Sequence, residues 1–261
     1  MNRGWGRILP PIALFIAFLI CWQLIATRIT AAFWILPAPS DVLNVLLYDS
    51  AVLWMHSWPT LVESVTGLVA ATLLGIVCAL AMHRLKLIKT LVYPYLIVSQ
   101  TVPVIAIAPL VVLWFGYGIS AKIFVTIIVC FFPVALGLYD GLRQVPVEQV
   151  RLLKSMGAGQ WRVYRLLYLP AALPGLFTGL RLGATYCVMG AVFGEWLGGN
   201  AGLGIYLTRS TRTFNTPGVF AAIILIVLIS LALFGLVVLL ERIFLAWHYK
   251  KAEEYEDRAG L

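Results

Sequence analysis

A few polar side chains within long apolar runs are the residues of this sequence that could act on a solute. Ser99, Gln100 and Thr101 stand together just before a proline, and Tyr186 and Glu195 lie in a later apolar run. Proline removes a helix hydrogen bond, and a freed carbonyl inside a membrane needs protein or a water-filled cavity around it. The pattern predicts a polar lining for a solute path, formed by Ser99, Gln100, Thr101, Tyr186 and Glu195.

Each of these residues also has a purely structural interpretation. Hydroxyl groups such as those of Ser99 and Thr101 can bond back to their own helix beside a kink. Glu195 could form a pair with Arg209 or Arg212 at the membrane surface instead of facing a path. Both alternatives remain open at this stage.

Reaction chemistry is not indicated anywhere in the sequence. A phosphate-binding loop needs Gly followed by Lys and a hydroxyl residue, and the sequence contains no Gly-Lys pair. His56, His83 and His248 are far apart, and the cysteines stand singly within apolar runs. We therefore expect no catalytic residues, no metal site, and no cofactor bound by this chain.

Composition indicates an integral membrane protein. The chain has 62% apolar and only 11% charged residues, with a mean hydropathy of +0.96. A net charge of +8 could suggest nucleic acid, but the basic residues form short clusters between apolar runs. Clusters of this kind are typical of proteins that use basic loops to set their orientation in a membrane, so nucleic acid is not an expected partner.

The expected fold is all-α, a polytopic membrane protein with six transmembrane helices in one domain, 1–261. A helix of about 20 apolar residues crosses a bilayer. The sequence offers six such segments, at about 9–26, 61–82, 91–115, 121–139, 171–197 and 219–240. The asymmetry of basic residues between alternate loops predicts that both termini and the loop 141–168 are cytoplasmic.

Glycines in the fifth segment have the spacing of a helix-packing face. They recur every four residues in two runs, at Gly175, Gly179 and Gly183 and then at Gly190 and Gly194. Small residues at this spacing allow two helix backbones to approach closely. Packing within the chain and packing against a second subunit are both compatible with the pattern.

The polar segment between the fourth and fifth spans predicts one short helix. Pro146 suits its first turn, Lys154 its last turn, and Gly157 the left-handed conformation that ends a helix. Val147, Val150 and Leu153 recur every three residues and form an apolar strip. Because the loop lies in water, this strip predicts a protein partner.

The same segment resembles the cytoplasmic coupling loop of binding-protein-dependent ABC import permeases. The family pattern is Glu-Ala-Ala, three residues, Gly, nine residues, Ile, one residue and Leu-Pro. Gly157, Leu167 and the pair Leu169-Pro170 fit this spacing, whereas Arg151-Leu152-Leu153 replaces Glu-Ala-Ala. Similarity continues outside the loop, in the motifs Leu113-Trp114-Phe115-Gly116 and Gly194-Glu195-Trp196-Leu197-Gly198.

The resemblance implies a non-catalytic permease subunit in the bacterial cytoplasmic (inner) membrane, working by alternating access. Its partners would be a second copy, two cytoplasmic ABC ATPases that bind ATP and magnesium, and an extracytoplasmic solute-binding protein. The ATPase-coupling residues would be Val147, Val150, Arg151, Leu152, Leu153, Gly157, Ala158, Leu169 and Pro170. The chain is most similar to permeases for nitrate, sulfonates, taurine and thiamine-pyrimidine precursors, and leans toward a hydroxymethylpyrimidine-like solute.

Two other classes of membrane protein remain as alternatives. A secondary transporter driven by ions usually has ionisable groups deep in its spans and an internal repeat, and neither is evident here. A membrane-embedded enzyme would need a polar constellation within the spans, which the sequence does not offer.

Overall fold

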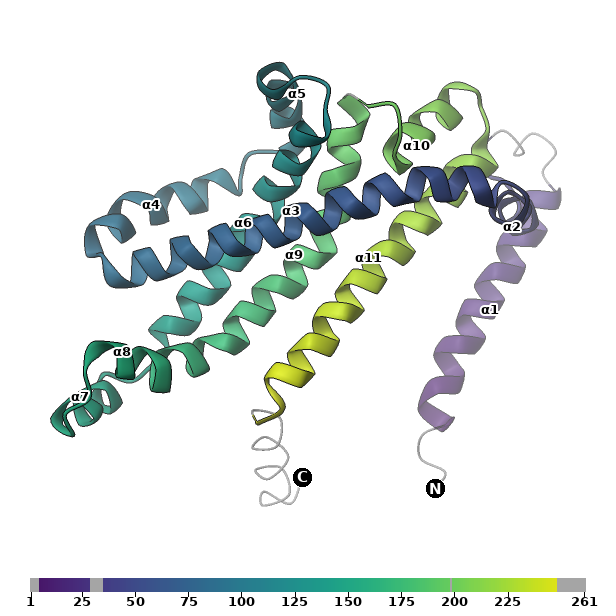
Figure 1. Ribbon diagram of the computed structural model, residues 1–261. Coiled ribbons are helices and arrows are strands. Elements are labelled where there is room, and N and C mark those ends of the chain that lie inside the picture. Colours follow the sequence, from purple (N-terminus) through teal and green to yellow (C-terminus); the bar gives the residue numbers. More distant parts are fainter. Residues whose placement is uncertain (1–4, 29–34, 198, 248–261) are drawn as a thin grey trace. The chain divides into compact units, whose positions relative to one another are not determined.

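The computed structural model of the 261-residue chain describes residues 5–28, 35–197 and 199–247, with side chains from residue 10 onward in the first helix (Figure 1). All regular elements in these described ranges are helices. The all-α class predicted from composition is thus confirmed. The two chain ends, predicted to be cytoplasmic, and Gly198 of the glycine-rich motif lie outside the described residues.

Five helices in the described part are long and apolar enough to cross a membrane. They are α1 (Trp5–Arg28), α3 (Ser50–Arg84), α6 (Ile119–Arg143), α9 (Leu169–Leu197) and α11 (Thr216–Phe244). Each contains one of the predicted apolar segments, and each is longer than that segment because polar and amphipathic turns continue the helix at its ends.

The predicted third span, 91–115, consists of two helices instead of one. Helix α4 (Lys86–Ser99) and helix α5 (Val104–Phe115) are bent by 109° at a short break. Pro103 precedes α5 and has extended backbone angles, φ −61° and ψ 121°. Proline was predicted to bend the backbone here, and the bend is large enough that this pair is either a broken span or a re-entrant loop.

The chain forms two compact units. The first contains residues 1–59 and 200–227, including α2 (Pro39–Tyr48) and α10 (Leu203–Arg212). Val42, Leu53 and Ala221 form its buried core. The Gly202 N–H donates to His56 Nδ1 at 3.1 Å, and burial raises the pKa of the nearby Tyr206 phenol.

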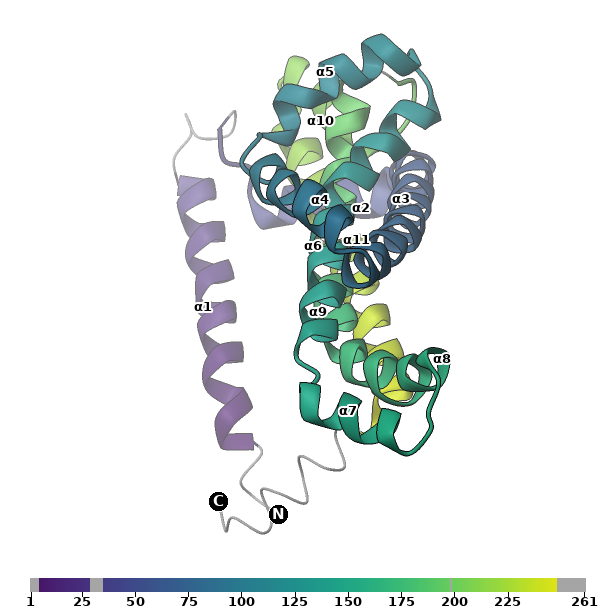
Figure 2. The ribbon, with the colours of Figure 1, turned by 90° about the vertical axis from the view of Figure 1, so that its left-hand side faces the viewer.

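The second unit, 60–199 with 228–261, is organised around α6 and α9, which lie side by side in both views (Figures 1 and 2). A side chain at Gly175 would collide with the Gly137 carbonyl, and one at Gly179 with the Pro133 carbonyl. Each glycine of the predicted packing face has an atom of α6 within 4 Å of the position a Cβ would take. The glycine face is therefore occupied within the chain.

A short irregular segment connects α6 to α9. It contains α7 (Val147–Ser155), the single turn α8 (Gln160–Val163) and the π-helical segment η2 (Tyr164–Tyr168), which leads directly into α9. Gly157 has φ +82°, and the Ala158 N–H donates to the Leu153 carbonyl at 3.1 Å, which closes the end of α7. The helix predicted between Pro146 and Gly157 is thus confirmed.

Candidate solute path and coupling segment

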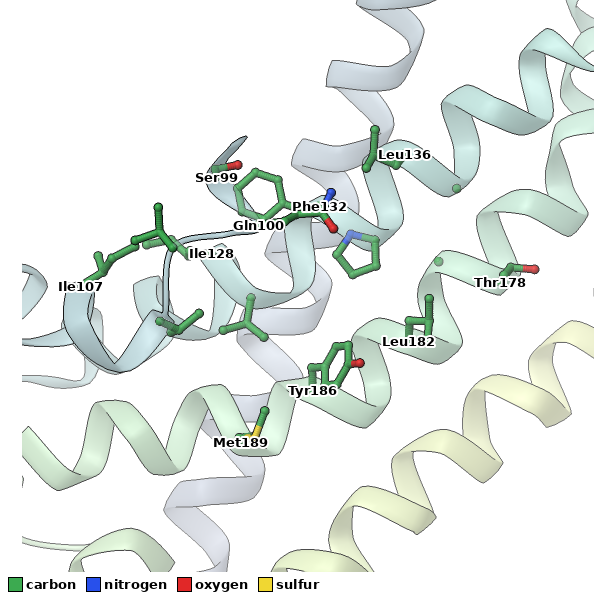
Figure 3. Close-up of a pocket in the computed structure, with 16 residues that line it drawn as sticks. Ser99, Gln100, Ile107, Ile128, Phe132, Leu136, Thr178, Leu182, Tyr186 and Met189 are labelled. Carbon is green, nitrogen blue, oxygen red and sulfur yellow. The ribbon is translucent and has the colours of Figure 1, made fainter. Parts of the chain in front are cut away.

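A cavity of about 480 Å³ lies in the second unit, where the α4–α5 break faces α6 and α9 (Figure 3). Its walls are mostly aliphatic and aromatic. The lining residues are Ser99, Gln100, Val102, Val104, Ile107, Ile128, Val129, Phe132, Pro133, Leu136, Gly137, Thr178, Gly179, Leu182, Tyr186 and Met189. Small-molecule sites in proteins have this composition, apolar walls with a few polar groups.

The cavity brings together three of the five residues predicted to line a path. Ser99, Gln100 and Tyr186 lie on its wall, although 86 positions separate Gln100 from Tyr186 in the sequence. Thr101 and Glu195 do not line it. The Thr101 hydroxyl donates to the Val98 carbonyl at 2.7 Å, the local bond considered as the alternative for this residue.

Of the four polar side chains on the wall, two donate to backbone carbonyls of their own helices and two form no hydrogen bond within the described residues. The Ser99 hydroxyl donates to the Leu96 carbonyl at 2.9 Å and the Thr178 hydroxyl to the Pro174 carbonyl at 3.0 Å. By contrast, the Gln100 amide and the Tyr186 hydroxyl form no hydrogen bond with the residues that the structure describes. An amide both donates and accepts, so this pair could bind a polar solute.

Two large apolar residues of the lining were not predicted. Phe132 and Met189 come from α6 and α9 and face the cavity together with Tyr186 (Figure 3). Their residue types are ordinary in apolar spans, so composition gave no signal that would distinguish them from core residues. Only the fold brings them to the cavity wall.

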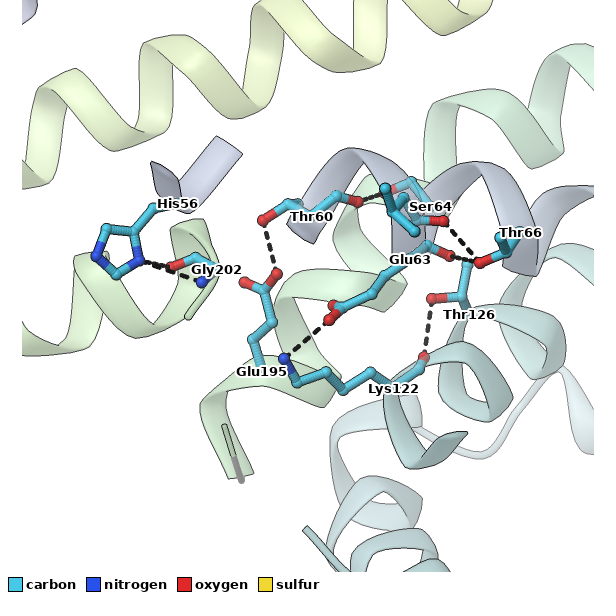
Figure 4. Close-up of polar contacts among 10 residues, drawn as sticks. His56, Thr60, Glu63, Ser64, Thr66, Lys122, Thr126, Glu195 and Gly202 are labelled. Atoms are coloured by element: carbon cyan, nitrogen blue, oxygen red, sulfur yellow. Dashed lines mark hydrogen bonds and ion pairs between the residues drawn. The ribbon is translucent and has the colours of Figure 1, made fainter. Parts of the chain in front are cut away.

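Glu195 belongs to a separate, buried polar cluster (Figure 4). Its side chain is fully buried, and its Oε1 accepts a hydrogen bond of 2.6 Å from the Thr60 hydroxyl. Beside it, the Lys122 Nζ lies 2.8 Å from the Glu63 Oε1, and both of these side chains are buried. The cluster therefore joins α3, α6 and α9 through charged and polar groups.

The residues of this cluster do not line the cavity. A buried ion pair favours one register of its helices, because separating the two charges in a medium of low dielectric constant is costly. The sequence places Glu63 and Lys122 in different apolar segments, 59 positions apart. The available signal for this pair was an acidic and a basic residue, each within an apolar span.

The segment from α7 to η2, residues 147–168, is called the coupling segment below. It exposes apolar side chains, but they are not all those of the predicted strip. Val147 is exposed, but Val150 and Leu153 are half-buried within the chain. The most exposed apolar side chains of this helix are instead Leu152, at 60%, and Met156 just beyond its end, at 76%. Arg151 and Ala158, also predicted to couple, are exposed and half-buried respectively, and Leu169-Pro170 opens α9.

The exposed apolar side chains of α7 and its end are therefore Val147, Leu152 and Met156. Large apolar side chains exposed on a polar loop are typical of surfaces that contact another protein. Periodicity in the sequence located the apolar positions but could not show which of them the chain itself covers.

A comparison with known protein families shows which family this chain matches. Residues 71–244 match the family model described as "Binding-protein-dependent transport system inner membrane component". This range contains the α4–α5 break, the cavity and the coupling segment.

Three curated relatives match over nearly their whole length. The chain is 37% identical to the formylaminopyrimidine transport permease protein ThiX of Halalkalibacterium halodurans, covering 96% of this chain and 100% of that protein. It is 32% identical to the riboflavin transport system permease protein RibX of Chloroflexus aurantiacus, covering 93% and 91%. It is 31% identical to the taurine transport system permease protein TauC of Escherichia coli, covering 88% and 86%.

A solved structure supports the fold. A chain in the crystal structure of an amino acid ABC transporter with histidines matches with a TM-score of 0.61 at 20% identity, covering 76% of this chain and 97% of that one. The family indicated by the coupling-loop motif is thus confirmed by sequence and by fold. The chain belongs to the family of inner membrane components of binding-protein-dependent transport systems, and is an ABC importer permease subunit.

Proposed function

We propose that this permease subunit moves a small, planar, polar solute of the aminopyrimidine class into the cytoplasm. The observation that carries the proposal is the cavity at the α4–α5 break, where Gln100 and Tyr186 are uncommitted and Phe132 adds an aromatic surface. An amide can pair with the ring nitrogen and amino group of a pyrimidine, and an aromatic side chain can contact the ring face. The name of the relative ThiX supports the same class.

Nitrate, taurine and aliphatic sulfonates are the alternative solutes. All three carry an anionic group, and TauC is named for taurine. However, the residues lining the cavity include no Lys, Arg or His. An anionic group entering the cavity would lose hydration without gaining a cationic partner, which favours a neutral ring over a sulfonate.

The working assembly we propose contains two copies of this chain, two cytoplasmic ABC ATPases and an extracytoplasmic solute-binding protein. ATP and magnesium would bind to the ATPases, so this chain needs no cofactor. Both termini and α7 would lie on the cytoplasmic side of the bacterial inner membrane. Exposure of Val147, Leu152 and Met156 on the coupling segment supports the ATPase contact.

Transport would proceed by alternating access. Closure of the ATPases would displace α7, and the displacement would reach α9 through η2 and the Leu169-Pro170 junction. Because α9 forms one wall of the cavity, its tilt would change which side of the membrane the cavity faces. Weak contacts suffice along such a path, since the binding protein makes the first selection of the solute.

Uptake competition in cells tests the solute class. Cells that express the complete transporter would take up labelled formylaminopyrimidine, and excess unlabelled taurine would leave that uptake unchanged. A Gln100→Leu change should lower uptake with membrane insertion unaffected, while Thr101→Val, beside it but off the cavity wall, should have little effect. Strong competition by taurine, or equal loss in both variants, would reject the aminopyrimidine assignment.

A further inference from the structure

A second cavity, of about 270 Å³, lies beside the coupling segment, in the second unit. It is formed where the last turn of α3 meets α7, α8 and η2. Its lining residues are His83, Arg84, Val150, Lys154, Gln160, Val163, Tyr164 and Tyr168. In contrast to the solute cavity, its wall is mainly polar.

The charge on this wall has one sign. Arg84 and Lys154 are cations, and no Asp or Glu is among the lining residues. Within the part of the chain that the structure describes, neither Arg84 nor Lys154 forms an ion pair. Two cations beside a polar cavity without a counter-charge attract an anion.

The remaining polar side chains of the wall are those of His83, Gln160, Tyr164 and Tyr168, and ring contacts join three of them. The Tyr164 hydroxyl lies 2.7 Å from His83 Nδ1, and the His83 ring lies 4.6 Å from that of Tyr168. The Tyr168 hydroxyl and the Gln160 amide form no hydrogen bond with other described residues. Both can therefore donate to a ligand oxygen.

The backbone of the wall is irregular at the same place. In η2 the Leu169 N–H bonds to the Tyr164 carbonyl, five residues earlier. This widened turn sets the direction of the Tyr164 and Tyr168 side chains toward His83. π-helical turns of this kind occur frequently at functional sites.

The cavity lies on the opposite face of α7 from Leu152 and Met156, two of its three exposed apolar residues. Val150 and Lys154, four residues apart, share the face that lines the cavity. Leu152 and Met156 are also four residues apart. They follow Val150 and Lys154 by two positions, which corresponds to about 200° around the helix. A protein covering Leu152 and Met156 would therefore leave the cavity free for a different ligand.

The position of Arg84 indicates where that ligand comes from. Arg84 is the last residue of α3, a 35-residue helix long and apolar enough to span the membrane. Because Arg84 follows directly on the apolar segment 61–82 of this helix, the cavity would lie at the level where phospholipid headgroups are concentrated. A guanidinium fork, an ammonium group and tyrosine hydroxyls match the phosphate of an anionic headgroup.

We propose that this cavity binds the phosphodiester headgroup of an anionic phospholipid. The headgroup would bridge Arg84 at the end of α3 and Lys154 on α7, and so fix the coupling segment to the membrane-spanning helices. The proposal goes beyond the transported solute and does not depend on its identity.

Photo-crosslinking in nanodiscs tests the site. The full chain would be placed in phosphatidylcholine containing photoactivatable phosphatidylglycerol, and labelled peptides would be identified by mass spectrometry. We expect labelling within residues 160–168. The double change Arg84→Gln with Lys154→Gln should lower it at least about fivefold, because two charge-assisted contacts are lost. The matched control, Lys86→Gln with Arg162→Gln, removes two exposed charges outside the cavity and should retain it.

Each other outcome overturns the proposal. Equal loss in the control would indicate diffuse surface charge, and equal labelling by phosphatidylcholine would remove headgroup selectivity. Displacement by millimolar inorganic phosphate would assign the cavity to a soluble anion. If the double variant does not insert, Lys154→Met should lower labelling and Lys154→Arg should restore it, and failure of that pair counts equally against the site.

Discussion

Removing one partner of the buried Lys122–Glu63 ion pair should lower the thermal stability of the chain, by an amount that can be worked out from the structure. Lys122→Met removes the cation that lies 2.8 Å from Glu63 Oε1 and leaves that carboxylate buried, with a side chain only 2% exposed. Breaking a buried pair in this way costs about 3–5 kcal/mol. Since 1 kcal/mol corresponds to roughly 2–4 °C in a chain of this size, the melting temperature should fall by about 6–20 °C.

Thermal unfolding in detergent micelles, followed by the loss of the monodisperse peak in size-exclusion chromatography, measures this change. The double variant Lys122→Met with Glu63→Leu should recover most of the loss, because removing both charges also removes their desolvation cost. Lys86→Met, an exposed cation without an ion pair in the described residues, is the control and should shift the midpoint little. A melting temperature within about 2 °C of wild type for Lys122→Met would refute the reasoning.

Three further predictions concern coupling, packing and orientation. Gly157→Val should abolish transport while insertion persists, because φ is +82° and a β-branched residue is strained there; normal uptake would remove the coupling role. Gly179→Val should destabilise the chain by about 1–3 kcal/mol through collision with α6, whereas Gly235→Val, which has open space, should change the melting temperature less. In a background without native cysteines, Gln149→Cys should react with an impermeant reagent only in inverted vesicles and Asn200→Cys only in intact cells; the reverse pattern would invert the proposed topology.

Sequence reasoning succeeded where the physical cause is local. A run of about 20 apolar residues has no stable place except a membrane or a core, so the long helices were predictable. The end of α7 was also predictable, because Gly157 can take the left-handed conformation seen in the structure without strain. The resemblance to the family depended on the same loop.

Features set by packing between distant segments were not predictable. Pro94, Pro103 and Pro109 have the same local chemistry, yet α4 and α5 continue through Pro94 and Pro109 and the chain breaks only before Pro103. Tertiary contacts decide which proline becomes a sharp bend. For the same reason periodicity alone did not reveal that Val150 faces inward and Leu152 outward.

Glu195 illustrates the limit for buried polar groups. Its cost in an apolar span predicted that it needs a partner, and this requirement is general. One partner, the Thr60 hydroxyl, lies 135 positions away in the sequence. Burial cost indicates that a partner exists, but only the fold identifies it.

The source of energy for transport is the most direct test of the central claim. The chain would be co-purified with its ATPase and binding protein and reconstituted into sealed vesicles, and uptake of labelled formylaminopyrimidine would be measured with ATP on the ATPase side. Uptake should require ATP hydrolysis and should continue when ionophores collapse the proton and sodium gradients. Uptake that needs an ion gradient and proceeds without ATP would contradict the account and would indicate a secondary transporter.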